Sequence, residues 1–210
     1  MKQITPMKLW LSFLTILALT AISCSDLSTI KDYNEDGSIY RTYQVDKDSL
    51  IQGKYIVYYE GDKNQVFEEA NYIDGKLNGE RALYYENGVA EIKEHYADDV
   101  LIDTVMVYYP SGQIKRKSSY DAGVLSGKVL SYYETGTLKE EATFVNNMEN
   151  GPFTEYHPNG QPKWKGSFLN GDSEFGELLA YNEEGTLIRK MMCDSNAVCS
   201  TFWTLEKGDL

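Results

Sequence analysis

The stretch GKVLSYYETGTLKEEATF, residues 127–144, contains the whole pattern from which the fold of this chain is read. Residues 127–133 are short and β-prone, residues 134–136 have the composition of a turn, and residues 138–144 form a second short run. Two such runs joined by a few turn residues are typical of a β-hairpin. Gly136 supplies the positive φ that the turn requires, because glycine lacks the Cβ atom that disfavours it.

The same pattern recurs at a nearly constant period. Successive turn glycines are separated by 24, 24, 24 and 25 residues, and a tyrosine stands four positions before each one. An aromatic residue follows each glycine by eight positions until Cys193 takes that place. A fixed period of this length is the signature of a repeat array. The turn glycines are Gly88, Gly112, Gly136, Gly160 and Gly185.

A second glycine series precedes the tyrosines and fixes the other end of each hairpin. Its members are Gly53, Gly79, Gly127, Gly151 and Gly176, with Thr104 taken as the third place in the series. The predicted fold class is therefore all-β, an elongated array of consecutive antiparallel β-hairpins with about 24 residues per repeat. The first unit is irregular, and we expect one or two extra residues to widen the turn after Tyr59.

The N-terminal residues have the composition of a secretory signal peptide. Lys2 and Lys8 precede an uncharged apolar stretch of 14 residues, 9–22, which is shorter than a membrane-spanning helix. Residues 19–24 (Leu-Thr-Ala-Ile-Ser-Cys) resemble a bacterial lipobox, which implies lipidation of Cys24; a free or structural cysteine is the alternative. We divide the chain into a lipoprotein signal peptide (1–23), a tether (24–32) and a β-hairpin repeat domain (33–210).

Composition favours a folded, acidic, exported protein. The net charge is −12, and removal of Lys2 and Lys8 with the signal peptide gives −14. Such a surface repels phosphate backbones, so nucleic acid is not an expected partner. Aromatic residues make up 13% of the chain, with 17 tyrosines, which argues against disorder. We expect attachment to the cell envelope through Cys24, in the outer membrane.

Two further cysteines, Cys193 and Cys199, stand close together near the C-terminus. In an oxidising compartment we expect them to form a disulfide that closes the last hairpin, with free thiols as the alternative. Two thiols alone do not complete a tetrahedral metal site, and His95 and His157 lie far away in the sequence. No metal and no cofactor is expected.

Alternation along the strands separates the side chains into two faces. The face with Ala82, Met106, Leu130, Thr154 and Leu179 is expected to pack, and the face with Arg81, Val105, Val129, Phe153 and Leu178 to be more solvated. The second tyrosine of each pair suggests a stripe that binds a glycan or a peptide strand. The alternative is a cross-strand ladder that only stabilises the sheet. The stripe consists of Tyr59, Tyr85, Tyr109 and Tyr133.

No arrangement of residues indicates catalysis. The many carboxylates, such as Asp98 with Asp99, fall in turn sequences, whereas general acid-base catalysis needs groups held in a cleft with separated pKa values. The glycines recur at repeat spacing, and no helix follows them to present its N-terminus to a phosphate. We therefore assign no catalytic residues, and a hydrolase built from repeat loops is the least favoured class.

Residues 84–88 (Tyr-Tyr-Glu-Asn-Gly), residues 132–141 and Asn78-Gly79 resemble the MORN-variant repeat, over roughly residues 33–193. In bacteria this repeat is associated with the group called YwqK-family antitoxins, and similar arrays occur as lipoproteins in the Bacteroidetes. The resemblance implies an elongated sheet of hairpins that serves as a binding scaffold and carries no catalytic residues. The leading hypothesis is an envelope lipoprotein that binds a protein or glycan; the alternative is an antitoxin or immunity-like protein that blocks a toxin by binding.

Overall fold

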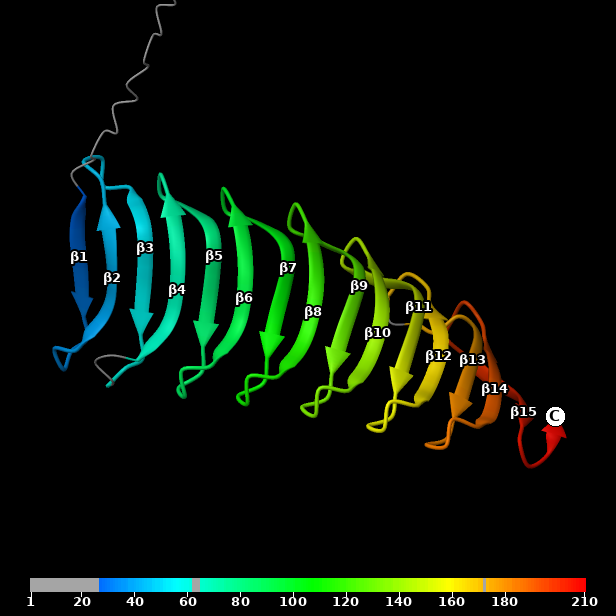
Figure 1. Cartoon of the computed structure of the whole chain (residues 1–210). Helices are drawn as coiled ribbons and strands as arrows, with labels where there is room; N and C mark the ends of the chain where they lie inside the picture. The colour runs from blue at the N-terminus through cyan, green and yellow to red at the C-terminus, as the bar shows by residue number, and fades with distance from the viewer. Residues whose placement is uncertain (1–26, 62–64, 172) are drawn as a thin grey trace, which may run out of the picture.

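The described residues form one antiparallel sheet of sixteen strands, each hydrogen-bonded to its neighbours in the sequence (Figure 1). The computed structural model describes residues 27–61, 65–171 and 173–210. The predicted all-β array of consecutive hairpins is confirmed. The strands are β1 (Ser28–Tyr33), β2 (Ile39–Val45), β3 (Ile51–Tyr58), β4 (Val66–Ile73), β5 (Lys76–Tyr84), β6 (Ala90–Ala97), β7 (Val100–Tyr108), β8 (Ile114–Asp121), β9 (Val124–Tyr132), β10 (Leu138–Val145), β11 (Met148–Tyr156), β12 (Pro162–Phe168), β13 (Gly176–Tyr181), β14 (Leu187–Cys193), β15 (Cys199–Thr204) and β16 (Gly208–Asp209).

The predicted glycine turns join the two strands of each hairpin and lie along the lower edge of the sheet in Figure 1. In the turn after β5, the N–H of Tyr85 donates to the carbonyl of Val89, and the N–H of Gly88 donates back to Tyr85. Gly88 has a φ of 80°, so the turn uses the backbone freedom predicted for it. We call residues 85–89, 109–113, 133–137, 157–161 and 182–186 the lower turns.

Two-residue turns at the opposite edge join one hairpin to the next. In the turn between β4 and β5, Asp74 and Gly75 both have positive φ, 51° and 78°, as in a type I′ turn. Ala122 adopts the same conformation at φ 48°, although alanine has no side-chain group that compensates for it. We call residues 74–75, 98–99, 122–123 and 146–147 the upper turns; the connection between β12 and β13 is longer and contains Asn170 and Gly171, which also have positive φ.

The second glycine series faces the aromatic residues across each hairpin. Gly79 pairs with Tyr96 and Gly127 with Phe144, so each ring has a residue without a side chain opposite it. The third member of this series is Asp103 and not Thr104, because Asp103 pairs with Tyr120 and has a φ of 67°. Aspartate tolerates this conformation better than most residues, so it can replace glycine at this position of the series.

The two faces of the sheet differ in packing. One row of cross-strand pairs on the face that we call face A contains Val105, Ser118, Val129, Ala142 and Phe153. The corresponding row on the opposite face, face B, contains Met106, Lys117, Leu130, Glu141 and Thr154. All five residues of the face A row are buried, whereas none of the five on face B is.

The prediction of the packed face was therefore wrong from β7 onwards, whereas in the preceding unit Ala82 on face B is buried as expected. Val129 and Leu178 on face A are 4% and 7% exposed, while Leu130 and Leu179 on face B are only half-buried. On face A the intervening strands contribute small residues such as Ala142, over which the flanking apolar side chains close. On face B the intervening residues are long and charged, so their ends lie in solvent.

The array begins earlier than the expected boundary at residue 33. Residues 28–33 form β1, paired with β2 along its whole length, so most of the expected tether is part of the sheet. Burial alternates along β1, where Ile30 and Asp32 are half-buried and their neighbours are exposed, as in a strand with one covered face. The N–H of Tyr59 donates to the carbonyl of Gln65, six residues on, whereas that of Tyr85 donates to Val89, four residues on. The first turn is therefore two residues wider, within the predicted one or two.

Candidate functional site

Tyr59, Tyr85, Tyr109 and Tyr133 are brought together in one row along the lower turns. Each residue begins a turn, and its hydroxyl donates a hydrogen bond to the backbone carbonyl at the end of the matching strand in the next repeat. The oxygen–oxygen distances are 2.6 Å from Tyr59 to Tyr84, and 2.8 Å from Tyr85 to Tyr108, Tyr109 to Tyr132 and Tyr133 to Tyr156. We call these four tyrosines the tyrosine ladder.

The ladder continues beyond the four tyrosines. His157 occupies the next position, and its Nε2 atom lies 3.0 Å from the carbonyl oxygen of Tyr181. The ring faces are also engaged, because Lys115 and Lys139 place their ammonium groups 5.6 Å and 5.9 Å from the ring centroids of Tyr109 and Tyr133. These contacts favour the ladder interpretation of the stripe over the ligand-binding one.

The surroundings of Tyr59 and Tyr85 raise the pKa of both phenols and so favour their neutral form. Burial raises the pKa of the Tyr85 hydroxyl, and the nearby carboxylate of Glu91 raises it further. Burial likewise raises the pKa of Tyr59, with Glu86 and Glu91 adding to the effect. A neutral hydroxyl is the form that donates to a carbonyl, so the surroundings of Tyr59 and Tyr85 support the hydrogen bonds that these two residues make to the next repeat.

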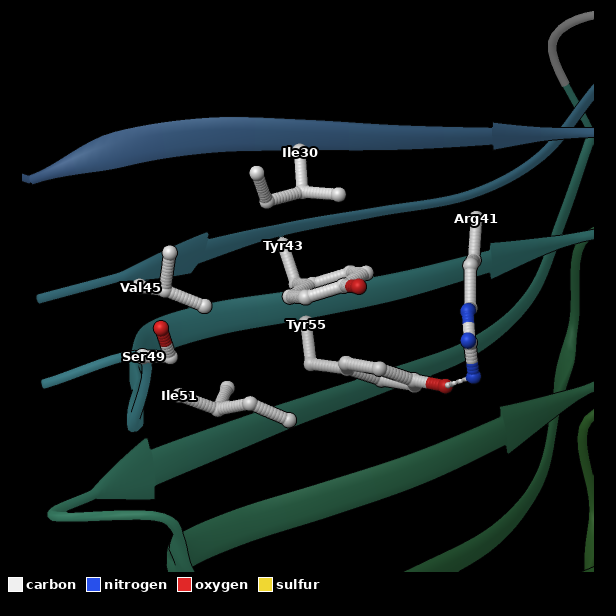
Figure 2. A pocket seen from close by; sticks show the side chains of 7 residues that line it. All are labelled: Ile30, Arg41, Tyr43, Val45, Ser49, Ile51 and Tyr55. Carbon is white, nitrogen blue, oxygen red and sulfur yellow. Dashed lines mark hydrogen bonds between the residues drawn. The ribbon is translucent and has the colours of Figure 1, made fainter.

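Face A is hollowed near its N-terminal end. Tyr43 and Tyr55, from β2 and β3, lie side by side with ring centroids 5.7 Å apart, beside Ile30 of β1 (Figure 2). Arg41 donates to the hydroxyl of Tyr55 at 3.2 Å and pairs with Asp32. These residues line a depression of about 380 Å³, which we call the tyrosine groove. It offers flat aromatic surface with polar groups at its rim.

A charged cluster interrupts the apolar row of face A at β4 to β6. Arg81 occupies the place held by Val105 in the next repeat, and it donates to Glu68 at 2.6 Å and to Glu94 at 2.7 Å. Burial opposes the charge on Arg81, but the hydrogen bonds to the two carboxylates outweigh it, so the pKa of the guanidinium is raised. This cluster lies between the tyrosine groove and the larger apolar surface towards the C-terminus.

The C-terminal part of face A contains a second hollow, of about 360 Å³. Phe153 and Phe168 stack with centroids 4.2 Å apart, and Trp164 lines the same hollow. Glu140 and Glu155, from β10 and β11, also line it and are directly paired across the two strands. We call this hollow the acidic aromatic pocket. Sequence reasoning did not find it, because it forms from four hairpins and no local motif marks it.

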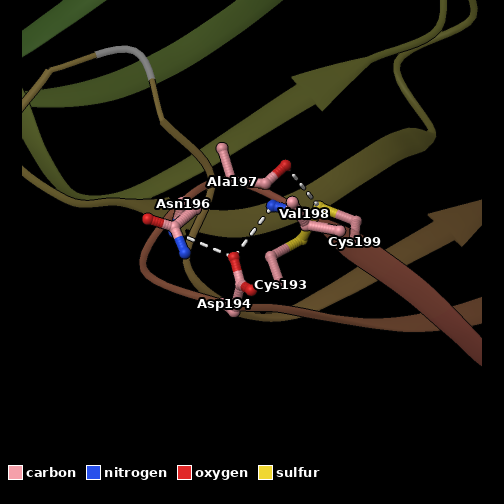
Figure 3. The surroundings of a disulfide bond; sticks show 6 residues. All are labelled: Cys193, Asp194, Asn196, Ala197, Val198 and Cys199. Carbon is pink, nitrogen blue, oxygen red and sulfur yellow. Dashed lines mark hydrogen bonds between the residues drawn. A yellow bond between two sulfur atoms is a disulfide. The ribbon is translucent and has the colours of Figure 1, made fainter.

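Cys193 and Cys199 are paired directly across β14 and β15 and are joined by a disulfide (Figure 3). The intervening turn is closed by Asp194, whose carboxylate accepts from the N–H groups of Asn196 and Val198. These two hydrogen bonds lower the pKa of Asp194. Cys193 is 2% exposed and belongs to the same buried apolar cluster of face A as Phe153 and Leu178, so the disulfide lies against the apolar core.

The other features predicted from the sequence do not lie in these hollows. Cys24 and the signal peptide lie outside the described residues. Within the described ranges there is no group of three or more histidine, cysteine, aspartate or glutamate side chains placed to hold a metal ion. Within the same ranges, no helix has the length and hydropathy needed to cross a membrane.

Comparison with known families identifies the repeat in the central part of the chain. The model of the MORN repeat variant matches residues 104–122, 125–146 and 149–170. Each match spans most of one hairpin and its lower turn, β7–β8, β9–β10 and β11–β12, so the predicted resemblance to this repeat is confirmed over three consecutive units. No curated protein matches the chain.

Proposed function

We propose that this protein is a non-enzymatic scaffold of the cell envelope, anchored through lipidated Cys24, which binds a protein or glycan partner through face A. The repeat scaffold itself follows from the sheet and from the family match to its central units. The envelope location rests on the signal and lipobox patterns of residues 1–24.

The observation that carries the proposal is the single-layer architecture. The described residues form one open sheet, with no second layer of strands or helices that covers face A. A sheet normally buries its apolar face against another element. Because no such element covers face A in the described residues, its rings, including Tyr43, Tyr55 and Tyr72, are only half-buried. These rings offer contact area to a partner.

The tyrosine groove is the part of face A whose chemistry best fits a glycan or a peptide. Tyrosine presents a flat apolar ring with a polar edge, which suits both a sugar ring and an extended chain. Arg41 adds a donor beside the rings, with its guanidinium 5.4 Å from the ring centroid of Tyr43. The groove lies on β1 to β3, next to the end of the chain that carries the proposed anchor.

Site-specific photo-crosslinking in intact envelopes tests this proposal. A benzophenone amino acid at position 30 lies on face A within the groove, and the same group at position 31 lies on face B of the same strand as a matched control. We expect an adduct from position 30 that disappears in the Tyr43→Ser variant, and none from position 31. Equal adducts from both positions, or none from either, would contradict binding through face A.

The anchor is tested by intact mass and detergent partitioning of the wild type and the Cys24→Ser variant. We expect a diacylglyceryl group on Cys24 in the wild type and release of the variant from the membrane. An uncleaved, unlipidated and soluble wild type would refute the envelope location. That result would instead favour the antitoxin alternative.

A further inference from the structure

We infer that the acidic aromatic pocket is a docking site for a lysine side chain of a protein partner. This inference rests on the proposed function, since it assigns a partner chemistry to face A. The pocket is remote from the tyrosine groove, from which the charged cluster around Arg81 separates it.

The first argument is an unbalanced pair of carboxylates. Glu140 and Glu155 are directly opposite each other on β10 and β11, where like charges destabilise a sheet. Lys163 forms an ion pair with Glu155 at 2.7 Å, but among the described residues Glu140 has no cationic partner. A cation that enters the pocket beside Glu140 relieves this repulsion.

The second argument is the shape and lining of the hollow. Phe153, Trp164 and Phe168 form an apolar aromatic wall, and Glu174 from the segment between β12 and β13 adds a third carboxylate to the lining. A lysine side chain combines an apolar stem with a compact terminal charge. Its methylenes fit along the aromatic wall, and its ammonium group meets the carboxylates and the face of an indole ring.

The third argument is the charge of the whole chain. With a net charge of −12, the protein attracts basic partners over distances beyond direct contact. The hollow of about 360 Å³ lies in the size range of sites that enclose small ligand groups, which is ample for one side chain. Charge complementarity therefore selects a lysine-bearing surface over an acidic or purely apolar one.

The test uses the full chain in detergent, labelled with 5-fluorotryptophan and followed by fluorine NMR. The probe is Nα-acetyl-lysine methylamide, and its norleucine analogue is the uncharged control. We expect a saturable shift of the Trp164 resonance with the lysine probe and less than a tenth of that shift with norleucine at equal concentration. Trp203 pairs with Lys190 on face B and serves as the internal reference.

Two substitutions make the test specific. Glu140→Gln should abolish the saturable shift, whereas Glu141→Gln, the next residue, should leave it unchanged because Glu141 pairs with Lys128 on face B. Independently of any ligand, Glu140→Gln should raise the unfolding midpoint by removing the like-charge pair, which shows that the variant folds.

Three outcomes would overturn the inference. These are equal shifts with lysine and norleucine probes, no shift of Trp164 at any probe concentration, and tighter binding of choline than of the lysine probe, which would indicate a quaternary ammonium site. The crosslinking experiment at position 30 reports on the tyrosine groove, whereas the fluorine NMR experiment reports on the acidic aromatic pocket. Failure of this inference can therefore be distinguished from failure of the proposed function.

Discussion

A Cβ atom added to Gly166 would lie 2.8 Å from Cε1 of Phe153, closer than real Cβ contacts allow. The same atom would lie 2.9 Å from Cδ1 of Leu178 on the other side. Gly166 occupies the place that Ser118 and Ala142 hold in earlier repeats. Of these three positions, glycine occurs between the largest neighbours, Phe153 and Leu178. The missing side chain therefore makes room for the two large ones.

Gly166→Ala is therefore expected to destabilise the protein. The added methyl group must displace Phe153 or Leu178, and overpacking of this kind costs about 1–3 kcal/mol. Urea unfolding measures the change. Ser118→Ala, flanked by the smaller Val105 and Val129, is the matched control and should change the free energy of unfolding less. Equal effects of the two substitutions would contradict the packing argument.

The upper turns predict a pair of opposite effects. Ala122 adopts φ 48° in one upper turn, and Asn146 adopts φ 52° at the same place in the next. The left-handed conformation costs an ordinary L-residue roughly 1–2 kcal/mol, and asparagine less. Ala122→Asn should thus raise the free energy of unfolding by about 1 kcal/mol, and Asn146→Ala should lower it by a similar amount. Changes of the same sign in both variants would refute the conformational explanation.

Tyr109→Phe should remove the hydroxyl that joins two repeats and leave the ring in place. The loss of one hydrogen bond to a backbone carbonyl is expected to cost about 1 kcal/mol in chemical denaturation. Tyr40→Phe is the control, since Tyr40 is 44% exposed on β2 and lies outside the ladder.

For the double variant Tyr109→Ser with Tyr133→Ser, loss of folding supports the ladder, whereas loss of ligand capture in a folded protein supports the binding stripe.

Alkaline pH should destabilise the fold through its half-buried phenols. Burial raises the pKa of Tyr72, Tyr84 and Tyr96, and nearby glutamates add to the effect. Between the unfolded pKa of about 10 and the higher folded values, the unfolded chain has lost protons that the native state retains. Stability from these groups is thus complete below pH of about 10 and declines above it. Denaturation from pH 8 to 11, with absorbance at 295 nm, measures this; stability that rises across that range would contradict it.

Reduction of the Cys193–Cys199 disulfide should loosen the C-terminal end of the array and leave the centre intact. A short loop of this kind contributes about 2 kcal/mol in the chain-entropy model. Terminal units lack one neighbour, so the effect should concentrate in β14 to β16. Hydrogen exchange with and without reductant measures it, and the Cys199→Ser variant should show no further response. Uniform acceleration across all strands would indicate instead that the disulfide stabilises the whole sheet.

The hairpins, the lower turns and the repeat register were predictable, because the glycines and tyrosines that define them recur at a fixed spacing. The packed face was not, because its burial depends on which residues become neighbours across strands: Val129 is buried because Ser118 and Ala142 flank it. The tyrosine row was predicted as a stripe. Its acceptors were not, because they are backbone carbonyls about 23 residues away that no side-chain pattern marks.

The strand order, in which each described strand is hydrogen-bonded only to its sequence neighbours, has a consequence for how such a protein changes in evolution. One 24-residue unit adds two strands, and strands lie about 4.8 Å apart, so each gained or lost unit alters the length of the molecule by about 10 Å. The flanking units still present matching partners, since the upper and lower turns bond from one unit to the next in the same way. Duplication or deletion therefore adjusts the distance between the two ends of the array without the redesign of a core.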